Sequence, residues 1–224
     1  MTVARAAFTL NDGIPLAPAA HFRPIDSPST LVLTTDASGD VHDAGVGGYA
    51  FHSDAPNTVF IVSEEWPAEI WAALLESARP PRERTVGALR CSMPAAELFG
   101  ALALAQAVAA QLDVAAVVAI GDCKPAAGAL NAAASPVPQM QGLVVAARAG
   151  VQQWLGVAVP RELNIDADRL SHPSQAAAVE ADARQAGWLV QRLAVPDHCW
   201  RSLAAKLSDD AGEWVEDDGD WKLR

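Results

Sequence analysis

Two aspartates stand where apolar stretches of the chain end. Asp36 follows "LVLTT" and Asp122 follows "VAAVVAIG", and both stretches read as buried strands. A side chain at a strand end is held rigidly at the rim of the sheet, where open α/β sheets bind ligands. Both residues are therefore candidates for chemistry, and the alternative for each is a turn aspartate that only closes its strand.

Two further acids fall in predicted helices. Glu97 lies early in an otherwise apolar helix that starts after Ser92, and no lysine or arginine stands three or four residues from it. A carboxylate beside a core is costly unless it is paired or binds a cation, although an acid in this position also complements the helix dipole. Asp168 begins a later helix in "NIDADRLSH", where its neighbour Asp166 is the rival candidate.

Four carboxylates with few cations nearby form a ligand set that suits hard divalent ions. Two such ions about 3.5 to 4 Å apart activate a water and stabilise the leaving oxygen in phosphodiester cleavage. A metal site built at the sheet rim would explain why the first strand ends on Asp36.

The elements that must position these acids read as an α/β fold. We expect three antiparallel strands in meander order and then alternating helices and strands, giving a mixed sheet flanked by helices. The expected strands are 29–38, 45–53, 57–63, 114–122 and 156–163. The expected helices are 67–78, a long helix after Ser92, 124–131, 139–155 and one starting near 166.

The order of the motifs resembles ribonuclease H (RNase H) domains, especially those of retrotransposon reverse transcriptases. The matching segments are "TTDASGD", "GVGGYAF", "AAELFGALALAQ", "VVAIGDCKPAAGALN" and "VPRELNIDADRLSH", between residues 30 and 172. The last motif, with Asn164, Ala167, Asp168, Leu170 and Ser171 in the pattern N-x-x-A-D-x-L-S, is the most specific.

The resemblance implies an RNase H-like fold and metal-dependent hydrolysis of the RNA strand of RNA–DNA hybrids. It implies two Mg²⁺ or Mn²⁺ ions as cofactors, and a reverse transcriptase polymerase domain or another subunit as partner. The catalytic, metal-binding acids are then Asp36, Glu97, Asp122 and Asp168. Substrate contacts are expected at Ser38, Gly39, Asn131 and Asn164, and Asn164 is also expected to fix the approach to the last helix.

The sequence departs from the family pattern in three places. Ala158 stands where many relatives have a histidine, which leaves His172 as a substitute candidate. The basic handle of some relatives is missing, because residues 123–156 contain only Lys124 and Arg148 as basic residues. The segment 64–91 is longer than the family pattern explains.

The charge of the chain is unfavourable for binding nucleic acid over a broad surface. Sixteen basic against 27 acidic residues give a net charge of −11, the wrong sign for binding through a large basic surface. The stretch Lys206 to Arg224 accounts for −4 of this charge. A basic loop with Arg79, Arg82, Arg84 and Arg90 either follows a phosphate backbone or is simply solvated.

The chain divides into three parts on composition. We expect an N-terminal arm over 1–28, an RNase H-like domain over 29–172, and a C-terminal helical extension with an acidic tail over 173–224. The tryptophans at 188, 200, 214 and 221 either anchor that extension or stack on bases. Three scattered cysteines and no apolar run long enough for a signal peptide or membrane span predict a reduced, intracellular location, cytoplasmic or nuclear, with no membrane.

Two other functions stay open at this point. One is a catalytically silent domain of the same fold that serves as a structural or interaction module. The other is a DNA-directed nuclease of the same superfamily.

Overall fold

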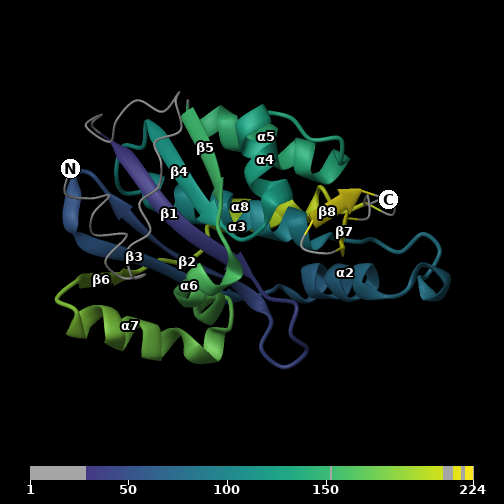
Figure 1. The fold of residues 1–224 in the computed structure, drawn as a ribbon, viewed down its shortest axis with the longest axis horizontal. Coiled ribbons are helices and arrows are strands. Elements are labelled where there is room, and N and C mark those ends of the chain that lie inside the picture. Colours follow the sequence, from purple (N-terminus) through teal and green to yellow (C-terminus); the bar gives the residue numbers. More distant parts are fainter. Residues whose placement is uncertain (1–28, 152, 209–213, 218–219, 224) are drawn as a thin grey trace.

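A six-stranded mixed sheet forms the centre of the protein in the computed structural model (Figure 1). The structure describes residues 29–151, 153–208, 214–217 and 220–223, so the N-terminal arm expected over 1–28 lies outside the described residues. The strand order is β5-β4-β1-β2-β3-β6. The strands are β1 (Thr30–Ala37), β2 (Gly45–His52), β3 (Ala55–Glu65), β4 (Ala116–Gly121), β5 (Gln153–Ala158) and β6 (Leu189–Arg192).

The expected fold class is confirmed. β1, β2 and β3 pair in antiparallel order, whereas β4 pairs parallel to β1 and β5 parallel to β4. The helices are α2 (Ala68–Ala78), α3 (Met93–Ala109), α4 (Lys124–Ala132), α5 (Pro138–Gly150), α6 (Ile165–Leu170), α7 (Ala176–Gln185) and α8 (Asp197–Ala204). Short 3-10 helices span Pro81–Glu83, Arg161–Leu163 and Pro173–Gln175.

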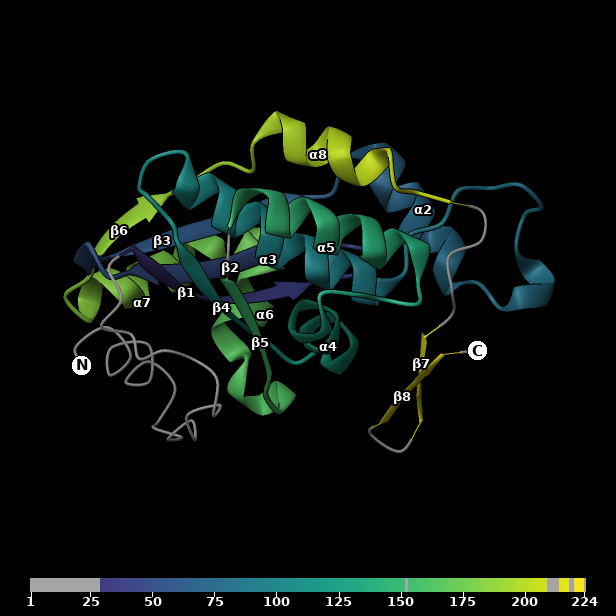
Figure 2. The ribbon, with the colours of Figure 1, turned by 90° about the horizontal axis from the view of Figure 1, so that it is seen from above.

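Helices cover both faces of the sheet (Figure 2). Side chains alternate between the two faces of a strand, so Leu31 and Leu33 of β1 pack with α2, α3, α5 and α8, while Val32 packs with α6 and α7. α3 is buried on nearly all sides, because it lies between the sheet and α5. This surrounding explains why the sequence of the helix is apolar on nearly every side.

The boundary between α5 and β5 differs from the sequence prediction. The helix expected over 139–155 ends at Gly150, and the strand expected over 156–163 lies at Gln153–Ala158. Trp154 lies buried in the strand, whereas the sequence predicts that the helix continues through it. β5 completes the parallel half of the sheet beside β4.

The C-terminal part is more than a helical extension. β6 pairs parallel to β3 and so becomes the sixth strand of the main sheet. After α8, β7 (Trp214–Asp217) and β8 (Asp220–Leu223) form a separate antiparallel hairpin. Within the described residues, no helix is long and apolar enough to cross a membrane.

Two of the four C-terminal tryptophans have described side chains, and both anchor the extension. Trp188 packs on Phe51 at a ring-centroid distance of 4.8 Å, and Trp200 packs on Phe99 at 5.1 Å. The side chains of Trp214 and Trp221 lie outside the described part of the chain.

Candidate metal centre

Asp36 lies at the end of β1 and is buried, with 4% of its surface exposed. Ser171 Oγ donates a hydrogen bond of 2.8 Å to Asp36 Oδ2, and Asn164 Nδ2 lies 3.5 Å from Oδ1. Burial raises the pKa of Asp36 from its ordinary 3.8 to about 6, although the Ser171 bond opposes this rise. Burial of this kind disfavours the ionised carboxylate, and a nearby cation favours it.

Asp122 leaves the sheet next to Asp36 because of the strand register. Thr34 of β1 pairs with Ile120 of β4, so the residues two positions further along both strands reach the same rim. The carboxyl ends of parallel strands therefore deliver both acids to one point, as the sequence led us to expect.

Glu97 reaches the same point from α3. Burial raises the pKa of Glu97 well above its ordinary value, and the charges of Asp36 and Asp122 add to that rise. The backbone N–H of Ala37 donates a hydrogen bond to the Glu97 carboxylate, which acts in the opposite direction. Glu97 is thus tied directly to the residue that follows Asp36.

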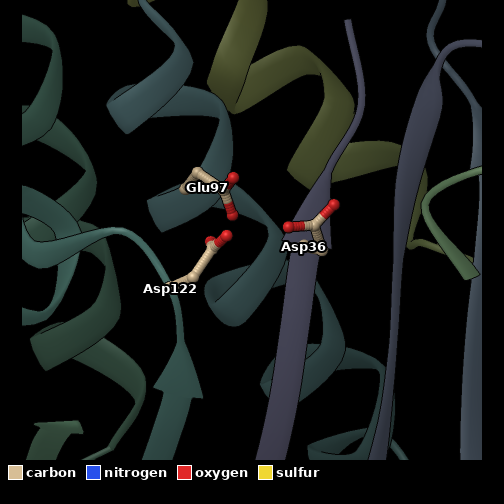
Figure 3. A group of neighbouring side chains, drawn as sticks. All are labelled: Asp36, Glu97 and Asp122. Atoms are coloured by element: carbon tan, nitrogen blue, oxygen red, sulfur yellow. The ribbon is translucent and has the colours of Figure 1, made fainter. Parts of the chain in front are cut away.

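The three acids converge (Figure 3). One oxygen from each of Asp36, Glu97 and Asp122 lies within 4.8 Å of the other two. Three carboxylates this close repel one another when ionised, and two of them are also desolvated. Oxygen ligands are what hard divalent cations take, so the donor set and its electrostatics fit Mg²⁺ or Mn²⁺.

Asp168 lies at the same cleft but outside this group of three. Its carboxylate Oδ1 pairs with Arg161 Nη2 at 3.0 Å, and both residues line the cleft that holds Asp36. Its rival Asp166 pairs with Arg169 at 3.1 Å and is not among the residues that line the cleft.

The residues expected to contact substrate have different surroundings. Ser38 and Gly39 line the cleft beside Asp36. Asn131 is engaged elsewhere, because its side-chain amide exchanges two 2.8 Å hydrogen bonds with the backbone of Gly156. Asn164 is fully buried and donates to the Thr35 carbonyl at 3.1 Å, so it holds β1 against the start of α6. These contacts give Asn131 and Asn164 roles within the fold.

α6 can approach β1 and β2 because Gly47 lacks a side chain. A Cβ atom at Gly47 would lie 2.1 Å from the backbone of Leu170, and Gly47 is the register partner of Asp36. The Ser63 hydroxyl also donates to the Leu170 carbonyl at 2.6 Å. This close approach brings Ser171 to Asp36, a contact that the sequence analysis missed although Ser171 belongs to the quoted motif.

The acids lie in a cleft of about 1030 Å³. Trp71, Leu74 and Leu75 of α2 line it, as do Arg84 and Arg90 of the segment that follows. The long segment 64–91, which the family pattern left unexplained, thus supplies part of the cleft. His172 also lines it, and its Nδ1 is buried without a hydrogen-bond partner among the described residues.

Comparisons with known proteins add likenesses of fold. No protein-family model matches the chain, and no curated protein matches it. RNase H1 from the halophilic archaeon Halobacterium salinarum NRC-1 is 17% identical, over 66% of this chain and 98% of its own, with a TM-score of 0.42. The N-terminal RNase H domain of rv2228c from Mycobacterium tuberculosis, solved as a fusion with maltose-binding protein, is 20% identical, over 69% and 99%, with a TM-score of 0.42.

The fold class is RNase H-like. Three leading antiparallel strands, a mixed sheet and flanking helices define it in this chain. Because both TM-scores and both identities are low, the function proposed below rests on the acidic site and on the sequence motifs.

Proposed function

We propose that this protein is a divalent-metal-dependent nuclease that hydrolyses the RNA strand of RNA–DNA hybrids. The observation that carries the proposal is the convergence of Asp36, Glu97 and Asp122 at one rim of the sheet. The motif around Asp168, which resembles the last motif of RNase H domains, directs the proposal to ribonuclease activity.

Each acid has a role in this proposal. Asp36, Glu97 and Asp122 hold the metal, and Asp168 completes the ligand set once it separates from Arg161. Two bound Mg²⁺ or Mn²⁺ ions would supply an activated water and stabilise the leaving oxygen. Ser171 and Asn164 keep Asp36 oriented, because both donate hydrogen bonds to its carboxylate.

The substrate enters along the cleft, with Ser38 and Gly39 nearest to the acids. Selection of RNA over DNA would come from contacts to the 2′-hydroxyl groups. We place this activity in residues 29–172 and infer a retroelement reverse transcriptase as its setting, from the motif order alone. The net charge of −11 weakens the binding of this chain to nucleic acid. A polymerase domain or another subunit would then supply most of the affinity for the hybrid. Three buried free cysteines suit a reducing intracellular compartment.

The deciding experiment is cleavage of end-labelled duplexes of one sequence, prepared as RNA–DNA hybrid, duplex DNA and duplex RNA. We expect Mg²⁺ or Mn²⁺ to support cleavage of the RNA strand of the hybrid, and both EDTA and Asp36→Asn to abolish it. Cleavage of duplex DNA at a similar rate would favour the DNA-directed nuclease instead. A folded protein that binds no metal and cleaves none of the three would favour the silent interaction domain.

A further inference from the structure

Trp66 connects to the loop that follows Asp36 at two points. Its side-chain Nε1–H donates a hydrogen bond of 2.9 Å to the Ser38 carbonyl, and its backbone N–H lies 3.4 Å from the Ala44 carbonyl. Trp66 comes directly after β3 and is 6% exposed. The Trp66 indole therefore holds the backbone two residues beyond a candidate metal ligand.

The backbone that Trp66 holds also contacts a second candidate ligand. The Ala37 N–H, one residue before Ser38, donates to the Glu97 carboxylate. Ser38 N–H closes the loop by donating to the Gly45 carbonyl at 2.8 Å. A shift of residues 37–38 would therefore disturb the bond between Ala37 and Glu97 and change the separation of the Asp36 and Glu97 carboxylates.

Two further rings hold the Trp66 ring. Its centroid lies 6.2 Å from that of Phe99 and 5.9 Å from that of Trp200, and Phe99 and Trp200 lie 5.1 Å apart. Phe99 is two residues beyond Glu97 on α3, and Trp200 belongs to α8 in the C-terminal extension. Rings at these separations attract one another beyond the effect of burial alone.

We propose that Trp66 is a positioning residue for the metal centre, and that Trp200 of the C-terminal extension acts through it. The indole hydrogen bond holds residues 37–38 so that Asp36 and Glu97 stay at metal-binding separation. The ring contact with Trp200 keeps the indole in place. This inference rests on the proposed metal-dependent function and gives α8, which lies outside the RNase H-like motifs, a part in it.

The test compares Trp66→Phe with Trp154→Phe. Trp154 is a matched control, because it is 7% exposed and its Nε1–H donates to the Ala147 carbonyl at 3.2 Å, away from the cleft. Each variant keeps an aromatic ring and loses one buried hydrogen bond. We expect both to lower the unfolding midpoint in EDTA, but only Trp66→Phe to weaken Mn²⁺ binding, by about tenfold, as for outer-shell residues of metal sites. Isothermal titration of the folded variants with Mn²⁺ measures this affinity.

Trp200→Ala tests the second step. We expect it to weaken Mn²⁺ binding, Trp200→Phe to restore most of the loss, and Trp200→Ala to add little when combined with Trp66→Phe. Equal Mn²⁺ affinity in Trp66→Phe and Trp154→Phe would overturn the positioning role, whatever their stabilities. Full additivity of the two substitutions would overturn the link through Trp200.

Metal titration separates this inference from the proposed nuclease activity. If the wild-type protein binds Mn²⁺ but cleaves no hybrid, the proposed function fails, and a selective loss in Trp66→Phe still supports the positioning role. If hybrid is cleaved and Trp66→Phe binds Mn²⁺ like the wild type, the function stands and the positioning role is wrong.

Discussion

Asp36 and Glu97 are the residues at which stability and function oppose each other. Both acids have raised pKa values, and the charge of Asp36 adds to the rise in the pKa of Glu97. Without a cation, the folded protein holds the pKa values of both acids above their ordinary range, so ionising them costs stability. With a divalent ion bound, the same closely spaced carboxylates serve as its ligands.

The metal-free protein should lose stability as the pH rises. The folded pKa of Asp36, about 6, lies above its ordinary 3.8, so the native state binds the extra proton between these values. The stabilising contribution is complete below about pH 4 and lost as the pH rises through about 6, a difference of about 3 kcal/mol for two pKa units. Unfolding midpoints in EDTA between about pH 4 and 7 measure it.

Asp36→Asn should flatten that pH dependence and be more stable than the wild type at neutral pH in EDTA, while losing hybrid cleavage. Removing one of three crowded carboxylates relieves both repulsion and desolvation. A variant that is less stable than the wild type in EDTA at neutral pH would contradict the crowding argument.

Asp168→Asn and Asp166→Asn should differ sharply in hybrid cleavage. Asp168 lines the cleft, whereas Asp166 pairs with Arg169 on another side of α6. We expect Asp168→Asn to reduce kcat on the order of tenfold or more, as losses at metal sites do. Asp166→Asn should cost little activity, because Asp166 lies outside the cleft and pairs with Arg169. Steady-state cleavage assays compare the two, and a larger loss in Asp166→Asn would show that the motif is read in the wrong register.

The convergence of Asp36, Glu97 and Asp122 could be predicted from the sequence, because each follows a local signal, a strand end or an isolated charge in an apolar helix. Their partners could not be found in the same way. Ser171 meets Asp36, and Trp66 meets Ser38, only after distant elements pack. Asn131 stays a predicted substrate contact, and its bonds to the backbone of β5 are likewise formed only after packing.

Helices and strands could be predicted from the sequence where the hydrophobic period and the flanking glycine or proline residues indicated the same element. The β1–β2–β3 meander, α2, α3 and β4 lie within a few residues of their predicted bounds. The predicted boundary between α5 and β5 was wrong because the apolar residues of "VQQWLGVAV" fit both the helical period of 3.6 residues and the strand period of two. β6 was missed because its four residues are exposed or only partly buried, and they form a strand only by pairing with β3.

Arg90, in the segment that follows α2, is a candidate contact for the substrate backbone. The Arg90 backbone is held on both sides, because its N–H donates to Ser208 at 2.9 Å and its carbonyl accepts from the Gln139 side chain. The Arg90 side chain lines the cleft, where a phosphate would give it an ionic partner. We expect Arg90→Gln to raise KM for the hybrid and to reduce the slope of log affinity against log salt by about one.

Arg82→Gln is the control, because Arg82 is exposed, pairs with Glu83 at 3.5 Å and is not a cleft residue. Affinity measurements across a salt series compare the two variants. If both variants weaken hybrid binding equally, the basic segment acts through its overall charge. If neither variant changes the affinity, the segment is a solvated loop.

For the whole molecule, the net charge of −11 sets how well the chain binds nucleic acid alone. Residues 209–224 contain seven acidic and two basic residues. Truncation after Ser208 keeps its backbone pairing with Arg90. We expect the truncated chain to bind hybrid more tightly at low salt, with the gain fading as the Debye length falls to about 8 Å near 0.15 M. Unchanged affinity at low salt would show that the tail does not limit binding.

The pairing of β3 with β6 bears on how the protein is made. The first three strands are neighbours in sequence and join by hairpins, so they can form early in synthesis. Thr58 pairs with Leu189, so the outer edge of β3 stays open until residues 189–192 have left the ribosome. An open strand edge is a template for pairing with another chain. A fragment cut at the end of the family motifs, near residue 172, would keep that edge open permanently, so it should aggregate where a chain that includes β6 does not.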